Sequence, residues 1–387
     1  MKIALLNGLC SIPSKEAESI FSMKMCEAYA DQGHEVSLFV SNHQDLDLQQ
    51  ITLDQVFKYY QVKNNFKIIR TNIFKSKIGL LWSLAFSIPF RVKLKGYDFI
   101  HARNLATAWG AAKWMNLPVV YEMHNTPDSN ESQLKMFRDF CKSPNCKMII
   151  TITKALADHI QQYIPSKVKV IVQPDGVSES SLISLGDKEE LRLALGIDSG
   201  NKKVAVYTGH LYRGRGIELI IQLAERLSNQ YYFIIAGGRE EDILFYKTMS
   251  AHLTNLDFVG HRSQLEVIKY QQAADVLLMP YDYKVSASGG GNTAAFASPM
   301  KMFEYMATGR PMISSTLPIL YEIISNNIHA IMVPYEDIDG WEKSLNYLDT
   351  HPLEGEIIGA NAKKEVEKYT WRSRVNNILE SVYQLKD

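Results

Sequence analysis

KVAVYTGHLYRGRGIELIIQLAERLSNQYYFIIA, residues 203–236, holds a strand, a helix and a second strand. The apolar runs Lys203–Thr208 and Tyr231–Ala236 are typical of buried strands, and the amphipathic stretch between them is typical of a helix. Two strands joined by a helix predict a parallel βαβ unit. Because this alternation recurs along the chain, the sequence predicts an α/β fold with parallel sheets.

The predicted strands fall into two series. The first is Lys2–Leu6, Glu35–Val40, Phe66–Arg70, Tyr97–His101, Pro118–Met123 and Lys147–Ile152. The second is Lys203–Thr208, Tyr231–Ala236, Leu256–Val259, Ala274–Met279, Pro311–Ser314 and Ala330–Val333. A long helix is expected over Lys15–Gly33, with Gly33 at its C-terminal cap, and further helices over Trp341–Leu385.

The length of the chain favours two domains. Its 387 residues are about twice a typical α/β domain, and turn residues at 174–176 separate the two strand series. We expect an N-terminal domain over 1–172 and a C-terminal domain over 173–370. A closing helix over 371–387 is expected to pack back on the first domain.

The net charge is zero overall but is unevenly spread. Residues 1–172 carry 21 Lys and Arg against 14 Asp and Glu, or +7, so the remainder carries −7. A positive first domain favours an anionic partner, such as a lipid surface or a phosphate-bearing acceptor. No nucleic-acid-binding signature accompanies this charge, so no nucleic-acid partner is expected.

The four cysteines, Cys10, Cys26, Cys141 and Cys146, form no CxxC framework and have no companion histidine cluster. In a chain of this size they predict reduced thiols and a cytoplasmic protein. The sequence opens directly on a strand, so no signal peptide is expected.

Residues 75–95, KSKIGLLWSLAFSIPFRVKLK, combine an apolar run with basic flanks. The uncharged run Ile78–Phe90 is shorter than the roughly 18 residues that a membrane-spanning helix needs. Two interpretations are open at this point. One is shallow insertion into an anionic membrane surface, which would make the protein peripheral at the membrane. The other is a buried helix of the first domain.

Two loops of the second series carry reactive side chains at carboxyl ends of predicted strands, where α/β sheets bind ligands. In YTGHLYRGRGIE (207–218), glycines and two arginines precede a helix, which suits a pyrophosphate, although a basic loop that only caps the helix is the alternative. In FASPMKMFEYMATGRP (296–311), Ser298 is the expected N-cap, and Lys301 and Glu304 share one helical face. Taken alone, that pair would be an exposed ion pair.

A third loop is YEMHN (121–125), where His124 follows a strand at its carboxyl end. That is a site position, although a single histidine is often structural. The first strand is not followed by GxGxxG, and no GxxxxGK[ST] occurs, which disfavours a dinucleotide oxidoreductase and a P-loop NTPase. Asp45 and Asp47 are two spaced acids in a polar stretch, so no metal site is expected there.

Together with segments 12–36 (IPSKEAESIFSMKMCEAYADQGHEV), 235–240 (IAGGRE) and 258–262 (FVGHR), these loops resemble the retaining family-4 glycosyltransferases, which have the GT-B fold. The resemblance covers nearly the whole chain, and SPMKMFEYMATGRPMISS (298–315) is its most specific part. It implies two Rossmann-like parallel-sheet domains that face a central cleft. The acceptor would lie on the N-terminal side and the nucleotide sugar on the C-terminal side.

The resemblance implies roles for particular residues. The helix start formed by Ser298, Pro299, Met300 and Lys301 would bind the donor diphosphate, and Glu304 would hold the ribose hydroxyls.

Arg215 would take the place of a second diphosphate-binding cation, and His124 that of a histidine near the reacting sugar. His124, Arg215 and Lys301 are therefore the predicted catalytic residues. Gly8, from the loop after the first strand, would approach the donor phosphates or the acceptor. Donor binding would also involve Gly209, Arg213, Gly238 and Arg262.

Two positions depart from the pattern of the family. Phe296 stands where many relatives have a glutamate that contacts the sugar, which leaves the donor sugar open. His210 stands where many have an arginine after Gly209, and Arg213 would supply that charge.

The implied reaction transfers a hexosyl unit, with retention, from a nucleoside diphosphate sugar to a hydroxyl of a sugar or lipid-linked acceptor. Polysaccharide or glycolipid synthesis is the expected context, with no bound cofactor and no metal. Two alternatives share the fold: a sugar-nucleotide epimerase and a non-catalytic partner subunit.

Overall fold

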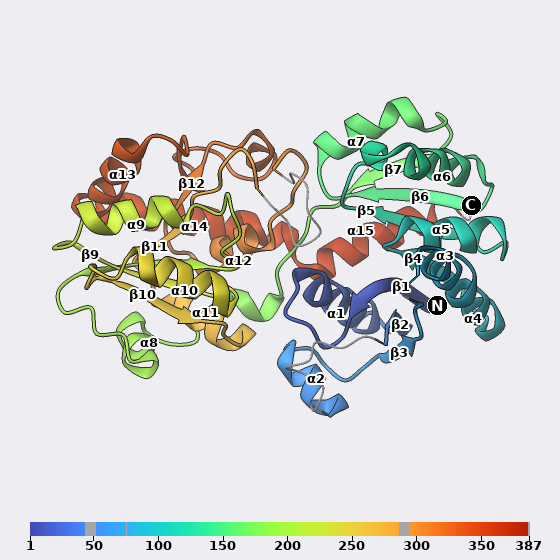
Figure 1. Ribbon diagram of the computed structural model, residues 1–387, viewed down its shortest axis with the longest axis horizontal. Coiled ribbons are helices and arrows are strands. Elements are labelled where there is room, and N and C mark those ends of the chain that lie inside the picture. The colour runs from blue at the N-terminus through green and yellow to red at the C-terminus, as the bar shows by residue number, and fades with distance from the viewer. Residues whose placement is uncertain (43–51, 75, 286–293, 386–387) are drawn as a thin grey trace. The chain divides into compact units, whose positions relative to one another are not determined.

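The computed structural model describes residues 1–42, 52–74, 76–285 and 294–385, and it contains two compact units (Figure 1). Unit 1 comprises Met1–Asp175 and Trp371–Asp387, and unit 2 comprises Gly176–Thr370. Each unit is built on one parallel sheet with helices on its faces. The predicted α/β class with two parallel sheets is confirmed.

In the described part of unit 1, seven parallel strands run in the order β3-β2-β1-β4-β5-β6-β7. They are β1 Lys2–Ser11, β2 Glu35–Ser41, β3 Lys67–Thr71, β4 Phe99–Ala102, β5 Val119–Met123, β6 Cys146–Thr151 and β7 Lys169–Val172. The direction in which successive strands are added to the sheet reverses between β1 and β4. In α/β sheets, ligands bind beyond the carboxyl ends of the strands at the point of such a reversal. The edge strand β7 was not predicted, because its four residues end where the turn signals begin.

Strand β1 is longer than predicted and contains Gly8, which was expected in the loop after it. The pairing of β1 with β2 shifts between Asn7 and Ser11, so Gly8 lies within an irregularity of the strand. A Cβ atom at Gly8 would lie 2.6 Å from Ile88 Cδ1 and 2.7 Å from Leu84 Cδ2. A side chain at this position would therefore displace the ends of Ile88 and Leu84.

The helices of unit 1 follow the predicted alternation. They are α1 Ala17–Ala30, α2 Leu53–Tyr59, α3 Lys77–Trp82, the π-helix η2 Ser83–Ser87, α4 Ile88–Lys95, α5 Leu105–Lys113, η3 Pro127–Ser129, α6 Glu131–Lys142, α7 Lys154–Ile160, η4 Gln161–Tyr163 and α15 Trp371–Tyr383. Helix α1 ends three residues before Gly33, which instead adopts a φ of 82° in the turn to β2. Helix α15 packs against α1, with the rings of Phe21 and Trp371 edge to face at 5.6 Å. All four cysteines are free and buried in this unit.

Unit 2 has six parallel strands among its described residues, in the order β10-β9-β8-β11-β12-β13. They are β8 Lys203–Thr208, β9 Tyr231–Ala236, β10 Leu256–Gly260, β11 Val276–Met279, β12 Met312–Ser315 and β13 Ile331–Val333. Its helices are η5 Glu179–Leu182, α8 Lys188–Leu195, α9 Ile217–Arg226, α10 Glu240–Met249, α11 Gln264–Ala273, α12 Met300–Thr308, η6 Pro318–Glu322, α13 Ile338–Thr350, α14 Pro352–Val366 and η7 Glu367–Tyr369. Its core packs side chains of β8 and β9 against α9 and the fully buried Trp341 of α13.

The segment 76–95, formed by α3, η2 and α4, has two different faces. Leu84, Ala85, Ile88 and Val92 are buried in unit 1. On the other side Ile78 is 85% exposed, Trp82 49%, Phe90 44% and Leu94 71%. One face therefore packs in the core, as the second interpretation expects, and the other leaves apolar side chains exposed, while Lys75 lies outside the described residues. Among the described residues, no helix is long and apolar enough to cross a membrane.

Candidate functional site

In unit 2 the loops after β8, β9 and β10 contact one another through glycines. Gly209 N donates to Ala236 O and Gly237 N donates to Gly260 O, both at 2.8 Å. Gly237 has a φ of 120°, and a Cβ atom on it would lie 2.2 Å from Gly209 O. No other residue fits this contact, so the three loops pack at the carboxyl edge of the sheet with backbone on backbone.

Lys301 and Arg215 lie together at this edge, on two tyrosine rings. Lys301 Nζ is 3.6 Å from the centroid of the Tyr207 ring and 5.1 Å from that of Tyr281. Arg215 Cζ is 4.7 Å from the Tyr281 centroid. A Cβ atom on Gly209 would lie 2.9 Å from Lys301 Nζ, which places the glycine loop directly beside the ammonium group.

Nitrogen atoms of both cations have unused hydrogen-bonding capacity within the part of the chain that the structure describes. Lys301 Nζ and Arg215 Nε are both buried without a hydrogen-bond partner among the described residues. Burial, and then the neighbouring Arg215 cation, lower the pKa of Lys301 well below its ordinary value. Buried cations are normally paired, because an unpaired charge in the interior is costly. The cluster is therefore complementary to an anionic ligand.

Helix α12 directs its N-terminus and two predicted site residues toward this region. It starts at Met300, with Pro299 rather than Ser298 at the N-cap position and no side-chain cap. The prediction for Ser298 was one residue too early, because Pro299 is extended (φ −75°, ψ 115°) and helical geometry starts only after it. The first-turn N–H groups of a helix favour negative charge.

Glu304, on the next turn of α12, is held beside the end of β8. Gln271 Nε2 donates to Glu304 Oε2 at 3.2 Å and to Thr208 Oγ1 at 3.0 Å. Tyr305 Oη accepts a hydrogen bond from Thr208 N at 2.8 Å. Strand β8, α11 and α12 therefore fix the carboxylate within the same part of unit 2 as the two cations.

Three other residues of the predicted donor site have different surroundings. Arg213 is exposed, and no described contact joins it to Lys301 or Arg215. Gly238 packs on Leu211, since a Cβ atom there would lie 2.6 Å from its side chain. Arg262 follows β10 and lies near Glu266. The pKa of Glu266 is lowered mainly by hydrogen bonds from Ser263 and to a smaller extent by the positive charge of Arg262.

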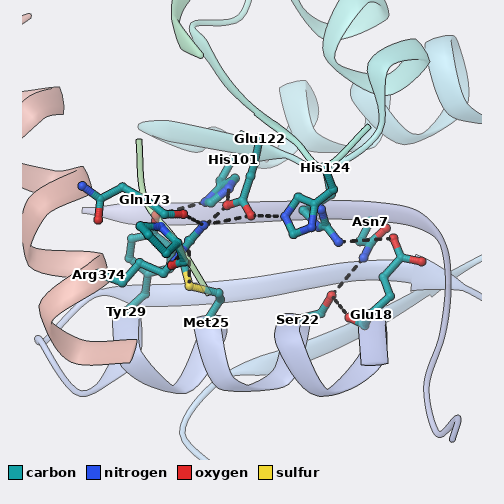
Figure 2. Close-up of polar contacts among 12 residues, drawn as sticks. Asn7, Glu18, Ser22, Met25, Tyr29, His101, Glu122, His124, Gln173 and Arg374 are labelled. Carbon is teal, nitrogen blue, oxygen red and sulfur yellow. Dashed lines mark hydrogen bonds and ion pairs between the residues drawn. The ribbon is translucent and has the colours of Figure 1, made fainter. Parts of the chain in front are cut away.

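In unit 1, His124 follows β5 directly and belongs to a buried polar network (Figure 2). Its Nε2 atom lies 2.5 Å from Glu122 Oε1. Glu122 Oε2 is 2.8 Å from His101 Nε2. Arg374 of α15 completes the carboxylate's partners, at 3.0 Å from Oε1 and 3.1 Å from Oε2.

Electrostatics keep the carboxylate charged and the histidines neutral. Burial alone would raise the pKa of Glu122, but Arg374 and the two histidine hydrogen bonds hold it well below its ordinary value. Burial, helped by the Arg103 cation, lowers the pKa of His124 from 6.5 to about 3. Burial also lowers the pKa of His101, against the effect of Glu122. At neutral pH, His124 is therefore a hydrogen-bonding group without charge.

Sequence reasoning missed Glu122, His101 and Arg374 in this network. Glu122 was read only as part of a strand, although a carboxylate in a buried parallel strand requires a buried partner. That signal was available, but the sequence gives no indication that the partner is Arg374. Tyr207 and Tyr281 were missed likewise, because a tyrosine in an apolar run predicts only core.

Among the described residues, no group of three or more His, Cys, Asp or Glu side chains could hold a metal ion. Asp45 and Asp47 lie outside the described residues.

Two family models match the chain. The model described as Glycosyltransferase Family 4 matches residues 20–180, and the one described as Glycosyl transferases group 1 matches residues 187–365. An uncharacterised glycosyltransferase of Methanocaldococcus jannaschii is 23% identical over 374 residues, which are 90% of this chain and 89% of that protein. The D-inositol 3-phosphate glycosyltransferase of Corynebacterium urealyticum is 23% identical over 312 residues, 73% of this chain and 70% of that protein.

The fold is similar to that of HepE from Anabaena, solved in complex with UDP-glucose. The TM-score is 0.74 at 16% identity, over 99% of this chain and all of that chain. The chain thus belongs to the family-4 glycosyltransferases and has the GT-B fold. It is an enzyme that uses a nucleotide sugar as its donor. The glycosyltransferase function predicted from the sequence is therefore confirmed.

The buried histidines predict that acid destabilises unit 1. Because His101 and His124 have lowered pKa values in the folded protein, the unfolded state takes up their protons first as the pH falls through about 6.5. The contribution of the two histidines to the free energy of unfolding should be flat above about pH 7 and should fall below it, by up to about 1.4 kcal/mol per pH unit for each. Burial raises the pKa of Asp175 to about 7, which contributes with the opposite sign over the same range, so the comparison of variants carries the test. Denaturant titrations between pH 8 and 5 measure this. His124→Gln should flatten the profile and His351→Gln, at an exposed position, should not; equal profiles for all three proteins would contradict the prediction.

Proposed function

We propose that the protein transfers a hexosyl unit, with retention of configuration, from a nucleoside diphosphate sugar to a hydroxyl group. The observation that carries the proposal is the pair Lys301 and Arg215, whose Nζ and Nε atoms are buried and make no hydrogen bond with the described residues. A diphosphate supplies the missing anion. As the glycosyl bond breaks, negative charge on the diphosphate grows, and fixed cations stabilise that charge most in the transition state.

Several features support a metal-free donor site in unit 2. Lys301, Arg215 and the N-terminus of α12 can together provide the positive charge that a divalent ion gives elsewhere. Glu304 is proposed to accept hydrogen bonds from the two ribose hydroxyls. Donor binding would extend over Ser298, Pro299, Met300, Gly209, Arg213, Gly238 and Arg262.

Unit 1 is proposed to bind the acceptor, through a region that includes Gly8 and His124. A neutral His124 can form hydrogen bonds with hydroxyl groups of the transferring sugar or the acceptor. The excess of basic residues in 1–172 supports an acceptor that carries a phosphate or is linked to a lipid. The relative from Corynebacterium urealyticum is named for an acceptor of the first kind, an inositol phosphate.

The exposed face of 76–95 supports a peripheral contact with a membrane. Trp82, Phe86 and Phe90 form a stack, with neighbouring ring centroids 4.3 Å and 5.8 Å apart. Basic side chains follow on α4, including Lys93 and Lys95 in its last turn. Aromatic rings beside lysines suit the headgroup layer of an anionic bilayer. If the acceptor is linked to a lipid, this contact would bring a cytoplasmic enzyme to the membrane that holds its acceptor.

Replacing the Lys301 ammonium tests the diphosphate site. Lys301→Met keeps the length of the side chain and removes a buried, unpaired charge, so the fold should be as stable as the wild type or more stable. Turnover should fall by about 10²-fold or more, because a group that stabilises charge in the transition state is lost. Steady-state kinetics with a panel of UDP, GDP and ADP sugars provides the measurement, and Arg215→Ala should behave alike. Lys343→Met, on the surface of α13, is the control. A rise in KM with unchanged kcat in both site variants would refute the assignment.

Glu304→Ala tests the ribose contact. The loss of two hydrogen bonds to a charged group, each worth about 1.5–3 kcal/mol, should weaken nucleoside diphosphate binding by at least roughly tenfold. Calorimetric titration of the folded variant measures the dissociation constant. Glu336→Ala, at an exposed position of unit 2, should bind as the wild type does. An unchanged constant in Glu304→Ala would remove the ribose assignment.

Vesicle sedimentation tests the membrane contact. The protein should sediment with anionic vesicles and stay in solution with neutral ones, and added salt should weaken the binding. Trp82→Glu should reduce binding in a folded protein. Leu193→Glu, which replaces an apolar side chain 84% exposed on α8 of unit 2, is the matched control. If the protein does not sediment with anionic vesicles at low salt, the membrane contact is refuted, and the segment 76–95 serves only in the core of unit 1.

A further inference from the structure

The carboxylate of Glu122 connects the C-terminal helix to His124 (Figure 2). We propose that Glu122 and Arg374 are positioning residues that hold His124 in a single tautomer, with the proton on Nε2. Nδ1 is then left to accept a hydrogen bond from a hydroxyl of the substrate. This inference rests on the proposed contact between His124 and the substrate.

The proton positions follow from the partners of Glu122. An ionised carboxylate only accepts hydrogen bonds, so the nitrogen 2.5 Å away, His124 Nε2, must be the donor. Because the pKa of His124 is about 3, the ring carries one proton at neutral pH, and Nδ1 has none. Nδ1 makes no hydrogen bond with the described residues, and the side chain is 19% exposed.

His101 gives the carboxylate a second fixed donor. Tyr29 Oη lies 3.0 Å from His101 Nδ1, and His101 Nε2 lies 2.8 Å from Glu122 Oε2. With Oε2 accepting from Nε2, Nδ1 of His101 accepts from the tyrosine hydroxyl. The hydrogen bonds from Tyr29 through His101 and the hydrogen bond from His124 therefore both end on Glu122, which accepts at its two oxygens.

Arg374 is held too firmly to serve as a mobile charge. Its Nε donates to Pro174 O at 2.9 Å and its Nη2 to Gln173 O at 3.1 Å. The remaining N–H groups meet Glu122 and Met25 Sδ. A guanidinium has five N–H groups, so this one is fully used. Arg374 neutralises Glu122 at both oxygens, and Oε1 also accepts the hydrogen bond from His124 Nε2.

The ring of His124 is also fixed by packing. The ring of Phe21 lies edge to face against it, with centroids 5.3 Å apart. Together with the bond to Glu122, this contact sets the direction of the Nδ1 lone pair. A neutral ring in this state neither donates from Nδ1 nor moves a proton, so it orients a hydroxyl rather than acting as an acid.

The experiment measures the tautomer directly. In full-length protein with ¹⁵N-labelled histidine, long-range ¹H–¹⁵N spectra distinguish the two ring nitrogens, and His124→Gln assigns the signals. The wild type should show only the Nε2–H form of His124 between pH 6 and 8. A mixture of tautomers, or an Nδ1–H form, in the wild type would overturn the inference.

A double variant keeps the test valid if single changes prevent folding. Glu122→Gln with Arg374→Met removes both buried charges at similar volume, so the fold should survive. His124 should then populate both tautomers, and kcat should fall roughly tenfold or more, with unchanged affinity for nucleoside diphosphate. Retention of a single tautomer or of full turnover would overturn the role of the pair. Val375→Ala, which destabilises α15 without touching the network, should change neither the tautomer nor kcat.

The two proposals fail separately. If the His124→Ala variant transfers the sugar at the wild-type rate, the proposed contact between His124 and the substrate is refuted, even if the wild type shows a single tautomer. If the tautomer is mixed while Lys301→Met loses turnover, the positioning role is wrong and the transfer function stands.

Discussion

A fully buried carboxylate on a central strand determines much of unit 1. Glu122 has no exposed surface, and its negative charge needs a partner inside the protein. Arg374 provides it from 252 residues further along the chain, which ties α15 to the sheet of the first unit. Removal of either partner would leave an uncompensated buried charge, a change that costs about 3–5 kcal/mol in proteins. The pair also decides the hydrogen-bonding state of His124.

The two units treat buried charge in opposite ways. In unit 1 the charges of Glu122 and Arg374 are matched, and the hydrogen-bonding capacity of the guanidinium is fully used. In unit 2, Lys301 and Arg215 are packed on tyrosine rings, and buried nitrogens of both lack partners among the described residues. Such a site is destabilising until an anion binds, which is expected of a centre that stabilises a leaving diphosphate. The paired network gives rigid geometry to unit 1, and the proposed role of Lys301 and Arg215 in unit 2 is electrostatic stabilisation.

Both sites lie at the carboxyl ends of parallel strands, and each is assembled from several short loops. Glycines at Gly209 and Gly237 let the loops of unit 2 pack backbone to backbone, which gives room for the Lys301 side chain. In unit 1 the segment 76–95 buries one face under the sheet and leaves aromatic side chains on the other. The same amphipathic segment therefore serves the core with one face and carries the proposed membrane contact on the other.

Local patterns in the sequence predicted the fold class, most of the strands, and the helix that carries Lys301 and Glu304. These features depend on spacings of two to four residues, which the sequence displays directly. The edge strand β7 and the exact start of α12 were missed, because a few residues near turn signals carry little periodicity. The family resemblance added Arg215 and His124. Only the tertiary structure decided that Arg215 is half-buried with a covered Nε while Arg213 is exposed, and that Arg374 pairs with Glu122. The reason is physical: a buried ion pair depends on which distant segments meet, and no local spacing records that.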